Sequence, residues 1–542
     1  MSFCNRLVLP IVLSSLAVLA GCSNNNNVTN GVAPPSGSFS DSNLNGTYVF
    51  SVAGTDFNGA AFAIVGSFTA NGSGGISGGT LDINDEDTSV FTNGPLPNLT
   101  ISGSSSYSVG KDGRGRATLD VSTPFGNTIA LAFVLEDSSH GLVTEFDGNA
   151  SGSGTLDVQT AGTTPTGTYA FSFSGSSYSN GDPFATVGNF TVGSGGSISG
   201  LEDFNESGLI AYPGETLTGS LSVGPSSTPT TTLSTSVFNG LLFDVYAIDA
   251  THLKFIEMDE FATLSGDAFS QTNTAVPSGT LAFTLQGFYP ASAASPFAAG
   301  GFMVMDNSGN ATVASTEDFA EGANLSTQPG TFTGSFTAGG SGRYVLGNLA
   351  TFVGGTSFAA YPSSGGLLLL EIDNTGITSG AAYPQTGSFA ASQGYALNLT
   401  GIYLGSSTLG TSPAEVDDIA EFTASSSGTA IGVIDENYAP GGAPTYGMAL
   451  NGTYTTPDGN GRGQISATAG NSSVSTLNGG FALNFYTADG TTFPFIELDG
   501  GQVSSGVFVL QNPTASAAAM AKTHLFIVPP LSKPHGALRK KK

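Results

Sequence analysis

A five-position pattern occurs four times along this 542-residue chain, and it constrains the fold more than any other feature. Its form is Glu-x-Asp-x5-Ser-Gly-x4-Gln, and successive copies lie about 115 residues apart. The copies are Glu145, Asp147, Ser153, Gly154 and Gln159; Glu257, Asp259, Ser265, Gly266 and Gln271; Glu371, Asp373, Ser379, Gly380 and Gln385; and Glu497, Asp499, Ser505, Gly506 and Gln511. A repeat of this length is the size of a complete domain, so the pattern predicts four tandem units of similar structure.

Each unit is expected to be all-β. Short runs of alternating apolar and polar residues are separated by Gly-, Asn- and Asp-rich turns, and no stretch holds a helical period. This pattern predicts seven or eight antiparallel strands per unit. Such a meander buries its apolar face as an up-and-down barrel or as a β-sandwich. We favour the barrel because closure removes the exposed edge strands that adjacent units would otherwise present to each other.

The units also begin alike, with Gly-Thr-Tyr-x-Phe or a close variant at residues 46–50, 167–171 and 279–283 and a weaker match at 401–403. These landmarks divide the chain. The predicted segments are a signal peptide at 1–22, a flexible tether at 23–43, β-units at 44–160, 161–275, 276–393 and 394–512, and a basic disordered tail at 513–542.

The N-terminal segment indicates export. An apolar stretch ends in Leu-Ala-Gly-Cys at residues 19–22, which is typical of a bacterial lipoprotein signal whose cysteine becomes the lipidated N-terminus. We therefore assign Cys22 as the lipid attachment site and expect the protein to be anchored in the outer membrane, with surface exposure as a further expectation. With 13 basic against 40 acidic residues the net charge is −27, which argues against a nucleic-acid partner.

The lipidation motif, the Gly-Thr-Tyr-x-Phe opening and the closing Glu-x-Asp, Ser-Gly and Gln together resemble the uncharacterised Gly- and Thr-rich tandem β-repeat lipoproteins of soil bacteria. That resemblance covers nearly the whole mature length and implies no activity. The unit architecture also loosely resembles lipocalin and avidin barrels, although this chain contains no Trp.

The recurring Glu and Asp are two residues apart on a predicted strand, so both carboxyl groups point to one face. Two carboxyl groups can perform acid/base chemistry, as in a glycosidase. We favour a structural role, because an active site is normally built once and this pair occurs in every unit. An arginine at one repeat position is the expected partner that fixes strand register. These are Arg116, Arg343 and Arg462, and in the second unit, which lacks the arginine, Lys254 is the candidate partner.

Calcium is the alternative explanation for so many acids. A second recurring cluster ends an early strand of each unit and offers oxygen ligands, with Asp82, Asn84, Asp203 and Asn205 as the candidate ligands. Turn capping by Asp and Asn explains the same residues and is preferred, so no metal or other cofactor is assigned. His140 and His252 each precede the recurring Glu by five residues and are expected in a turn.

The sequence therefore predicts a lipid-anchored exported protein with a structural, adhesive or binding role and no catalytic residues. Its expected partners are the membrane, through the lipid, and a surface glycan or protein. Small-ligand binding inside each barrel is the first alternative, and a secreted glycan-acting hydrolase is the second.

Overall fold

The computed structural model describes residues 31–515, apart from 93, 125, 161–164, 179–180, 209, 223–229, 239, 292–294, 406–412, 440–443, 471–475 and 477–479. The expected signal peptide, Cys22, most of the tether and the basic tail beyond residue 515 lie outside this part. Within it the chain is all-β, and its strands form four consecutive antiparallel sheets. No helix among these residues is long and apolar enough to cross a membrane.

Barrel 1 is a nine-stranded sheet that curls back on itself. Its strands are β1 (Asn45–Asp56), β2 (Ala61–Asn71), β3 (Ile76–Asp85), β4 (Leu96–Ile101), β5 (Ser106–Val109), β6 (Arg114–Thr123), β7 (Gly126–Leu135), β8 (His140–Glu145) and β9 (Ala150–Val158), preceded by the 3₁₀ turn η1 (Asp41–Asn43). The edges are β4 and β5. The edge strand β4 lies against β6, and just after β4 the Ser102 amide donates to the Asp120 carbonyl of β6 at 2.9 Å.

Barrel 2 is closed and has eight strands. They are β10 (Gly167–Ser177), β11 (Pro183–Val192), β12 (Ser197–Glu206), β13 (Ile210–Ser222), β14 (Thr230–Ser234), β15 (Leu241–Ala247), β16 (His252–Glu257) and β17 (Ala262–Ser270), with the 3₁₀ turn η2 (Ser194–Gly196) between β11 and β12.

Barrel 3 closes through the pairing of β19 with β20, and the short β21 is attached to β20. Its strands are β18 (Gly279–Phe288), β19 (Pro296–Met305), β20 (Asn310–Glu321), β21 (Asn324–Leu325), β22 (Gly330–Gly340), β23 (Arg343–Ala350), β24 (Phe358–Ser363), β25 (Gly366–Glu371) and β26 (Ile377–Pro384).

Barrel 4 is closed and has eight strands. They are β27 (Gln393–Tyr403), β28 (Ala414–Ala424), β29 (Thr429–Ala439), β30 (Thr445–Tyr454), β31 (Arg462–Ala469), β32 (Phe481–Tyr486), β33 (Thr492–Glu497) and β34 (Gln502–Leu510). The register corrects one sequence prediction: β27 begins eight residues before the weak match at 401–403, and Tyr395 pairs with Phe422 as Tyr48 pairs with Phe68 in barrel 1.

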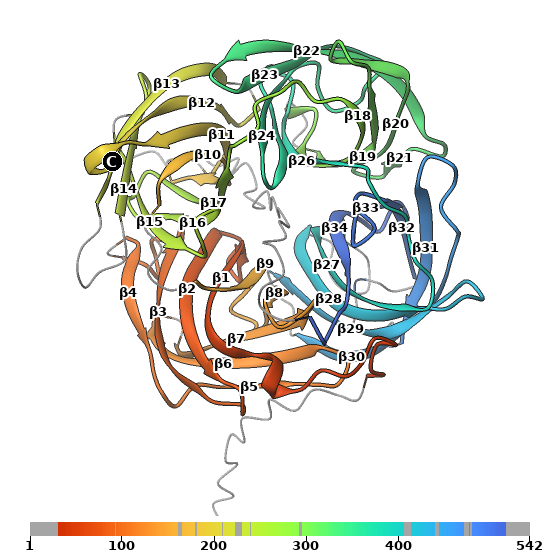
Figure 1. The fold of residues 1–542 in the computed structure, drawn as a ribbon. Coiled ribbons are helices and arrows are strands. Elements are labelled where there is room, and N and C mark those ends of the chain that lie inside the picture. Colours follow the sequence, from red (N-terminus) through yellow and green to blue (C-terminus); the bar gives the residue numbers. More distant parts are fainter. Residues whose placement is uncertain are drawn as a thin grey trace, which may run out of the picture.

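The four barrels are arranged in a ring, with barrel 4 against barrel 1 (Figure 1). The same elements meet each time: the second strand of one barrel packs against the closing hairpin of the next, as β2 does on β16 and β17 and as β28 does on β8 and β9. The barrel prediction is thus confirmed over the sandwich.

Apolar packing follows this plan. One apolar cluster fills each barrel, where alternating inward side chains are mostly aromatic or branched. A smaller apolar cluster lies between each pair of neighbouring barrels. The clusters between barrels matter for function, because they join the four barrels into one continuous body.

Candidate functional site: the joints between barrels

The recurring Asp-x-Asn cluster lies on the outer face of each barrel, directed at the next barrel in the ring. Its Asp residues are Asp82, Asp203, Asp318 and Asp435, all at most 1% exposed. The following polar side chain is Asn84, Asn205 or Asn437, and Ala320 replaces it in barrel 3. The alternation of the strand puts these residues outside, while Ile83 and Phe204 between them point into the barrel.

At the joint between barrels 2 and 3, Asp203 accepts a forked ion pair from Arg343 of barrel 3. The Arg343 Nε lies 2.7 Å from Asp203 Oδ2, and Nη2 bonds the other carboxylate oxygen. The Tyr361 hydroxyl donates to Asp203 Oδ2 at 2.6 Å. Such a bidentate pair fixes orientation as well as supplying energy.

The joint between barrels 3 and 4 repeats this geometry. Arg462 of barrel 4 reaches Asp318 of barrel 3, with Nε–Oδ2 at 2.6 Å and Nη2–Oδ1 at 2.9 Å. The Tyr486 hydroxyl donates to Asp318 Oδ2 at 2.7 Å. The expected pairing of these arginines with the Glu-x-Asp of their own units is therefore wrong: each arginine holds the preceding barrel.

At the ring-closing joint the arginine is Arg114, not Arg116. The Arg114 Nη1 lies 3.1 Å from Asp435 Oδ2 of barrel 4, and its Nε lies 2.9 Å from Asp112 Oδ2. Arg116 instead stacks over Tyr446 of barrel 4, with its guanidinium carbon 3.7 Å from the ring centroid. Each arginine follows a glycine, and both lie on the same face of β6. The sequence alone therefore could not show which of the two binds Asp435.

The joint between barrels 1 and 2 has no arginine and uses acids instead. The Tyr246 hydroxyl donates to Asp82 Oδ2 at 2.6 Å. Burial, together with the charge of Asp82, raises the pKa of Asp244 to about 7, so that a protonated carboxyl can share its hydrogen with Asp82.

Lys254 belongs to this joint too, but not as the expected partner of Glu257 and Asp259. Its Nζ lies 3.0 Å from Asp267 Oδ1 and 3.5 Å from Asp157 Oδ2 of barrel 1. His140 Nδ1 lies 2.9 Å from Asp157 Oδ1, and His252 Nε2 lies 2.6 Å from Asp267 Oδ1. The two histidines thus end a buried chain of five charged or titratable groups across the joint.

The Asn side chains bind the closing hairpin of the next barrel, which carries that barrel's Glu-x-Asp. Asn84 Nδ2 donates to the carbonyls of Glu257 at 2.7 Å and Ala262 at 2.9 Å. In the same way Asn205 donates to Glu371 and Gly376, both at 2.9 Å, and Asn437 donates to Glu145 at 2.9 Å and Ala150 at 2.8 Å. The two sequence motifs are therefore the two halves of one contact, and Ala320 leaves this contact out at the joint between barrels 3 and 4.

Within this closing hairpin the Glu and the Asp of Glu-x-Asp have different roles. The Asp accepts the backbone amide two residues ahead, closing the turn: Asp147 from Asn149, Asp259 from Phe261, Asp373 from Thr375 and Asp499 from Gly501, at 2.8 to 2.9 Å. The Glu is buried. Desolvation, strengthened by the nearby Asp, raises the pKa of Glu257 to about 11 and of Glu371 to about 9, and raises those of Glu145 and Glu497 well above the ordinary value.

The closing Gln of each barrel completes the joint by donating to a backbone carbonyl of the next barrel. Gln159 reaches Ala247 at 2.7 Å, Gln271 reaches Pro362 at 3.0 Å, Gln385 reaches Asn460 at 2.7 Å, and Gln511 reaches Asp112 and Leu135 at 2.9 and 3.0 Å. The last of these joins barrel 4 back to barrel 1.

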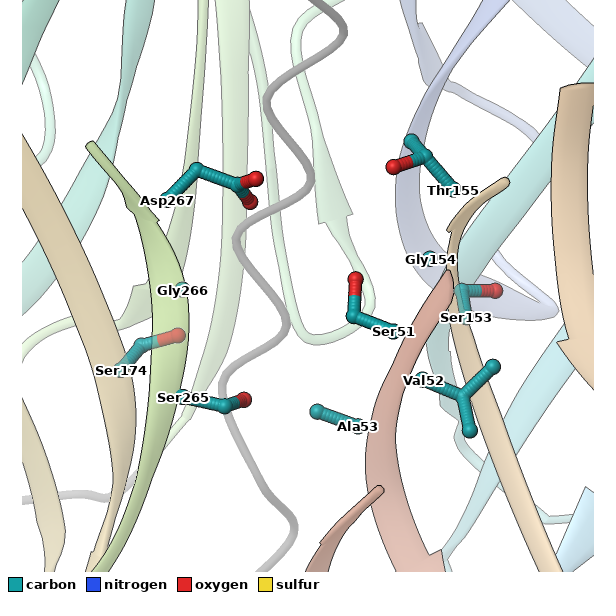
Figure 2. A pocket seen from close by; sticks show the side chains of 10 residues that line it. All are labelled: Ser51, Val52, Ala53, Ser153, Gly154, Thr155, Ser174, Ser265, Gly266 and Asp267. Carbon is teal, nitrogen blue, oxygen red and sulfur yellow. The ribbon is translucent and has the colours of Figure 1, made fainter. Parts of the chain in front are cut away.

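In barrels 1 and 2 the repeated Ser-Gly borders one small cavity. Figure 2 shows Ser153 and Gly154 of β9 opposite Ser265 and Gly266 of β17, around a cavity of about 20 Å³. The interior of barrel 3 holds a cavity of only about 10 Å³, lined by eight apolar side chains including Phe283 and Phe332. Each has about the room of one water.

The calcium candidates Asp82, Asn84, Asp203 and Asn205 are all engaged in these joints with protein groups. In the part of the chain that the structure describes, no group of three or more His, Cys, Asp or Glu side chains could hold a metal ion.

No protein-family model and no curated protein matches the chain. Solved structures similar to it include isotype 1 transferrin-binding protein B from serogroup B Neisseria meningitidis, with 11% identity, a TM-score of 0.17, and coverage of 69% of this chain and 84% of that one. A mutant of the vaccine antigen transferrin-binding protein B from Haemophilus parasuis Hp5 gives 10% identity, a TM-score of 0.17, and coverage of 70% and 83%. At these TM-scores the likeness carries no argument about this chain.

Proposed function

We propose that this protein is exported and lipid-anchored through Cys22 in the outer membrane, where its ring of barrels serves a structural, adhesive or binding role without catalysis. The observation that carries the proposal is the use of the recurring residues. The recurring Gln, the Asp-x-Asn cluster and the arginines make the contacts that join one barrel to the next and close the ring. The Glu of Glu-x-Asp is buried in the joint, and its Asp closes a turn there.

The buried acids support the non-catalytic role. A glycosidase needs one ionised and one protonated carboxyl group flanking a bond in a site that substrate can enter. Here Glu257 and Glu371 are buried under the neighbouring barrel, and their Asp partners hold a turn. The four pairs also lie in four different joints, so they do not converge on one cleft.

The outer surface suits repeated weak contacts. On β13 the exposed residues Thr216, Thr218, Ser220 and Ser222 alternate with the buried Leu217 and Leu221. A rigid ring that presents several such faces gains affinity through multivalency with a surface glycan or protein.

Lipid anchoring is tested by expressing the full chain in a Gram-negative bacterium supplied with an alkyne-labelled fatty acid. We expect the wild type to carry the label and to sediment with membranes, and Cys22→Ala to be unlabelled. An unlabelled wild type, or a Cys22→Ala protein that keeps the label, would contradict the proposal.

A further inference from the structure

A groove of about 680 Å³ opens at the surface where barrels 2 and 3 meet, far larger than the cavities described above. It is lined by Thr168, Asn189, Thr191, Ser199, Gly200, Leu201, Gln271, Thr274, Ser341 and Gly342. This volume is in the range of small-ligand sites. Apart from Leu201 and the glycines, every lining side chain is a hydroxyl or an amide, and none carries a charge.

The floor of the groove is a fixed pair of amides. Asn189 Nδ2 donates to Gln271 Oε1 at 2.9 Å and to the Ser341 carbonyl, while Asn189 Oδ1 accepts the Leu201 amide at 3.1 Å. Asn189 is 2% and Gln271 6% exposed. Because these amides bind one another and the turn at Ser341, the floor is held in place before any ligand arrives.

The register explains why the equivalent place at the joint between barrels 3 and 4 is filled. Asn189 pairs with Ala170 across β10 and β11, and the corresponding pair in barrel 3 is Phe302 with Ala282. The Phe302 ring packs edge-on against Tyr486, with centroids 5.5 Å apart. A short polar side chain in barrel 2 thus leaves space that an aromatic ring occupies one joint further on.

The rim supplies hydroxyl groups. Thr191, Ser199, Thr274 and Ser341 are exposed, and the Thr168 and Thr191 hydroxyls lie 2.8 Å apart. Hydroxyls and amides both donate and accept hydrogen bonds, which matches the hydroxyl groups of a sugar. The positive charge of Arg343 in this joint is neutralised by the Asp203 carboxylate. A chain with a net charge of −27 repels anions, and no carboxylate lines the groove to hold a cation.

We propose that this groove is a binding site for a short stretch of a neutral glycan. The inference deepens the binding role proposed above by giving it a place and a ligand class. It does not depend on lipid anchoring, so either can fail while the other stands.

The test uses the mature chain from residue 23 and saturation-transfer NMR with four neutral trisaccharides: maltotriose, cellotriose, mannotriose and chitotriose. We expect at least one to bind and Thr191→Arg, which fills the groove, to weaken that binding at least about tenfold. The matched control is Thr69→Arg. Thr69 is exposed and bonds Thr47 at 3.0 Å on barrel 1, as Thr191 bonds Thr168 on barrel 2.

Thr69→Arg is expected to bind like the wild type, and both variants are expected to melt like it. No binding of any trisaccharide, equal losses in both variants with unchanged melts, or tighter binding of anionic trigalacturonate would overturn the proposal. If Thr191→Arg melts lower than the wild type, Ser199→Arg takes its place in the same comparison. Ser199 also lines the groove and pairs with Thr191 across β11 and β12.

Discussion

The side chain of Asn437 donates a hydrogen bond of 2.9 Å to the backbone carbonyl of Glu145, a residue 292 positions away. The same contact is made by Asn84 and Asn205 at the joints of barrels that follow one another in the chain. Barrels 4 and 1 are not consecutive in the chain, so noncovalent contacts close the ring. They include a backbone hydrogen bond of 2.7 Å from the Asn512 amide to the Glu136 carbonyl.

Removing that contact tests the joint. Asn437→Ala leaves the carbonyls of Glu145 and Ala150 buried without a donor, and the expected loss is about 1 to 3 kcal/mol in the free energy of unfolding, measured with urea. The control is Asn451→Ala, because Asn451 is exposed on β30. It should change stability by less than about 0.5 kcal/mol. Equal effects of the two substitutions would show that the Asn437 contact contributes nothing specific.

Substituting the two arginines of β6 should lower the free energy of unfolding by different amounts. Arg114→Ala leaves two buried carboxylates without their cation, and we expect a loss of about 3 to 5 kcal/mol. Arg116→Ala removes a stacking contact with Tyr446, and about 1 kcal/mol is expected. Thermal and urea unfolding of both variants measure the difference. A larger loss for Arg116→Ala would mean that Arg116, as the sequence predicts, and not Arg114 is the arginine that holds the joint.

Stability should fall as pH rises from acid to neutral. Burial raises the pKa of Glu202 to about 7, so the folded chain keeps a proton that the unfolded chain has already lost above about pH 4.5. Its stabilisation is therefore fully present below about pH 4.5 and is lost as pH rises to about 7. Glu371, with a pKa raised to about 9, and His140, whose pKa is raised by Asp157, act in the same direction.

The variant Glu202→Gln isolates this effect, because a Gln oxygen can still accept the Thr186 hydroxyl that now lies 2.6 Å from Glu202 Oε1. Between pH 4.5 and 7 we expect the free energy of unfolding, measured with urea, to change less in the variant than in the wild type, with a difference of up to about 3 kcal/mol. A wild type that is more stable at pH 8 than at pH 5 would refute the assignment.

The repeat and the alternation of its strands were enough to predict four antiparallel barrels. The ring was not predictable from them, because a repeat gives the same residues in each unit without saying whether they contact their own unit or the next. Arg114 and Arg116 share one strand face, so periodicity could not choose between them. The substitution of Ala320 for Asn was a usable signal: it marks a position that contacts another unit and is not needed to close a turn.

Other residues were missed for a similar reason. Tyr246, Tyr361 and Tyr486 each precede the closing hairpin of a barrel and bind the Asp of the preceding barrel. Asp417 accepts the Ser151 and Ser153 hydroxyls of barrel 1 at 2.7 and 2.6 Å. These partners lie more than 150 residues apart, and no local pattern encodes such a distance.

The distance between barrels 1 and 4 tests most directly whether the body is a closed ring. The chain from residue 23 contains no cysteine, so Asn149→Cys and Ala449→Cys can carry two spin labels for pulsed EPR. The Phe146 and Tyr446 rings lie 4.8 Å apart, which places the labelled backbones within about 30 Å of each other. For a closed ring we expect one narrow distribution of spin–spin distances in that range. A broad distribution beyond about 60 Å, as four separate barrels in a string would give, would contradict it.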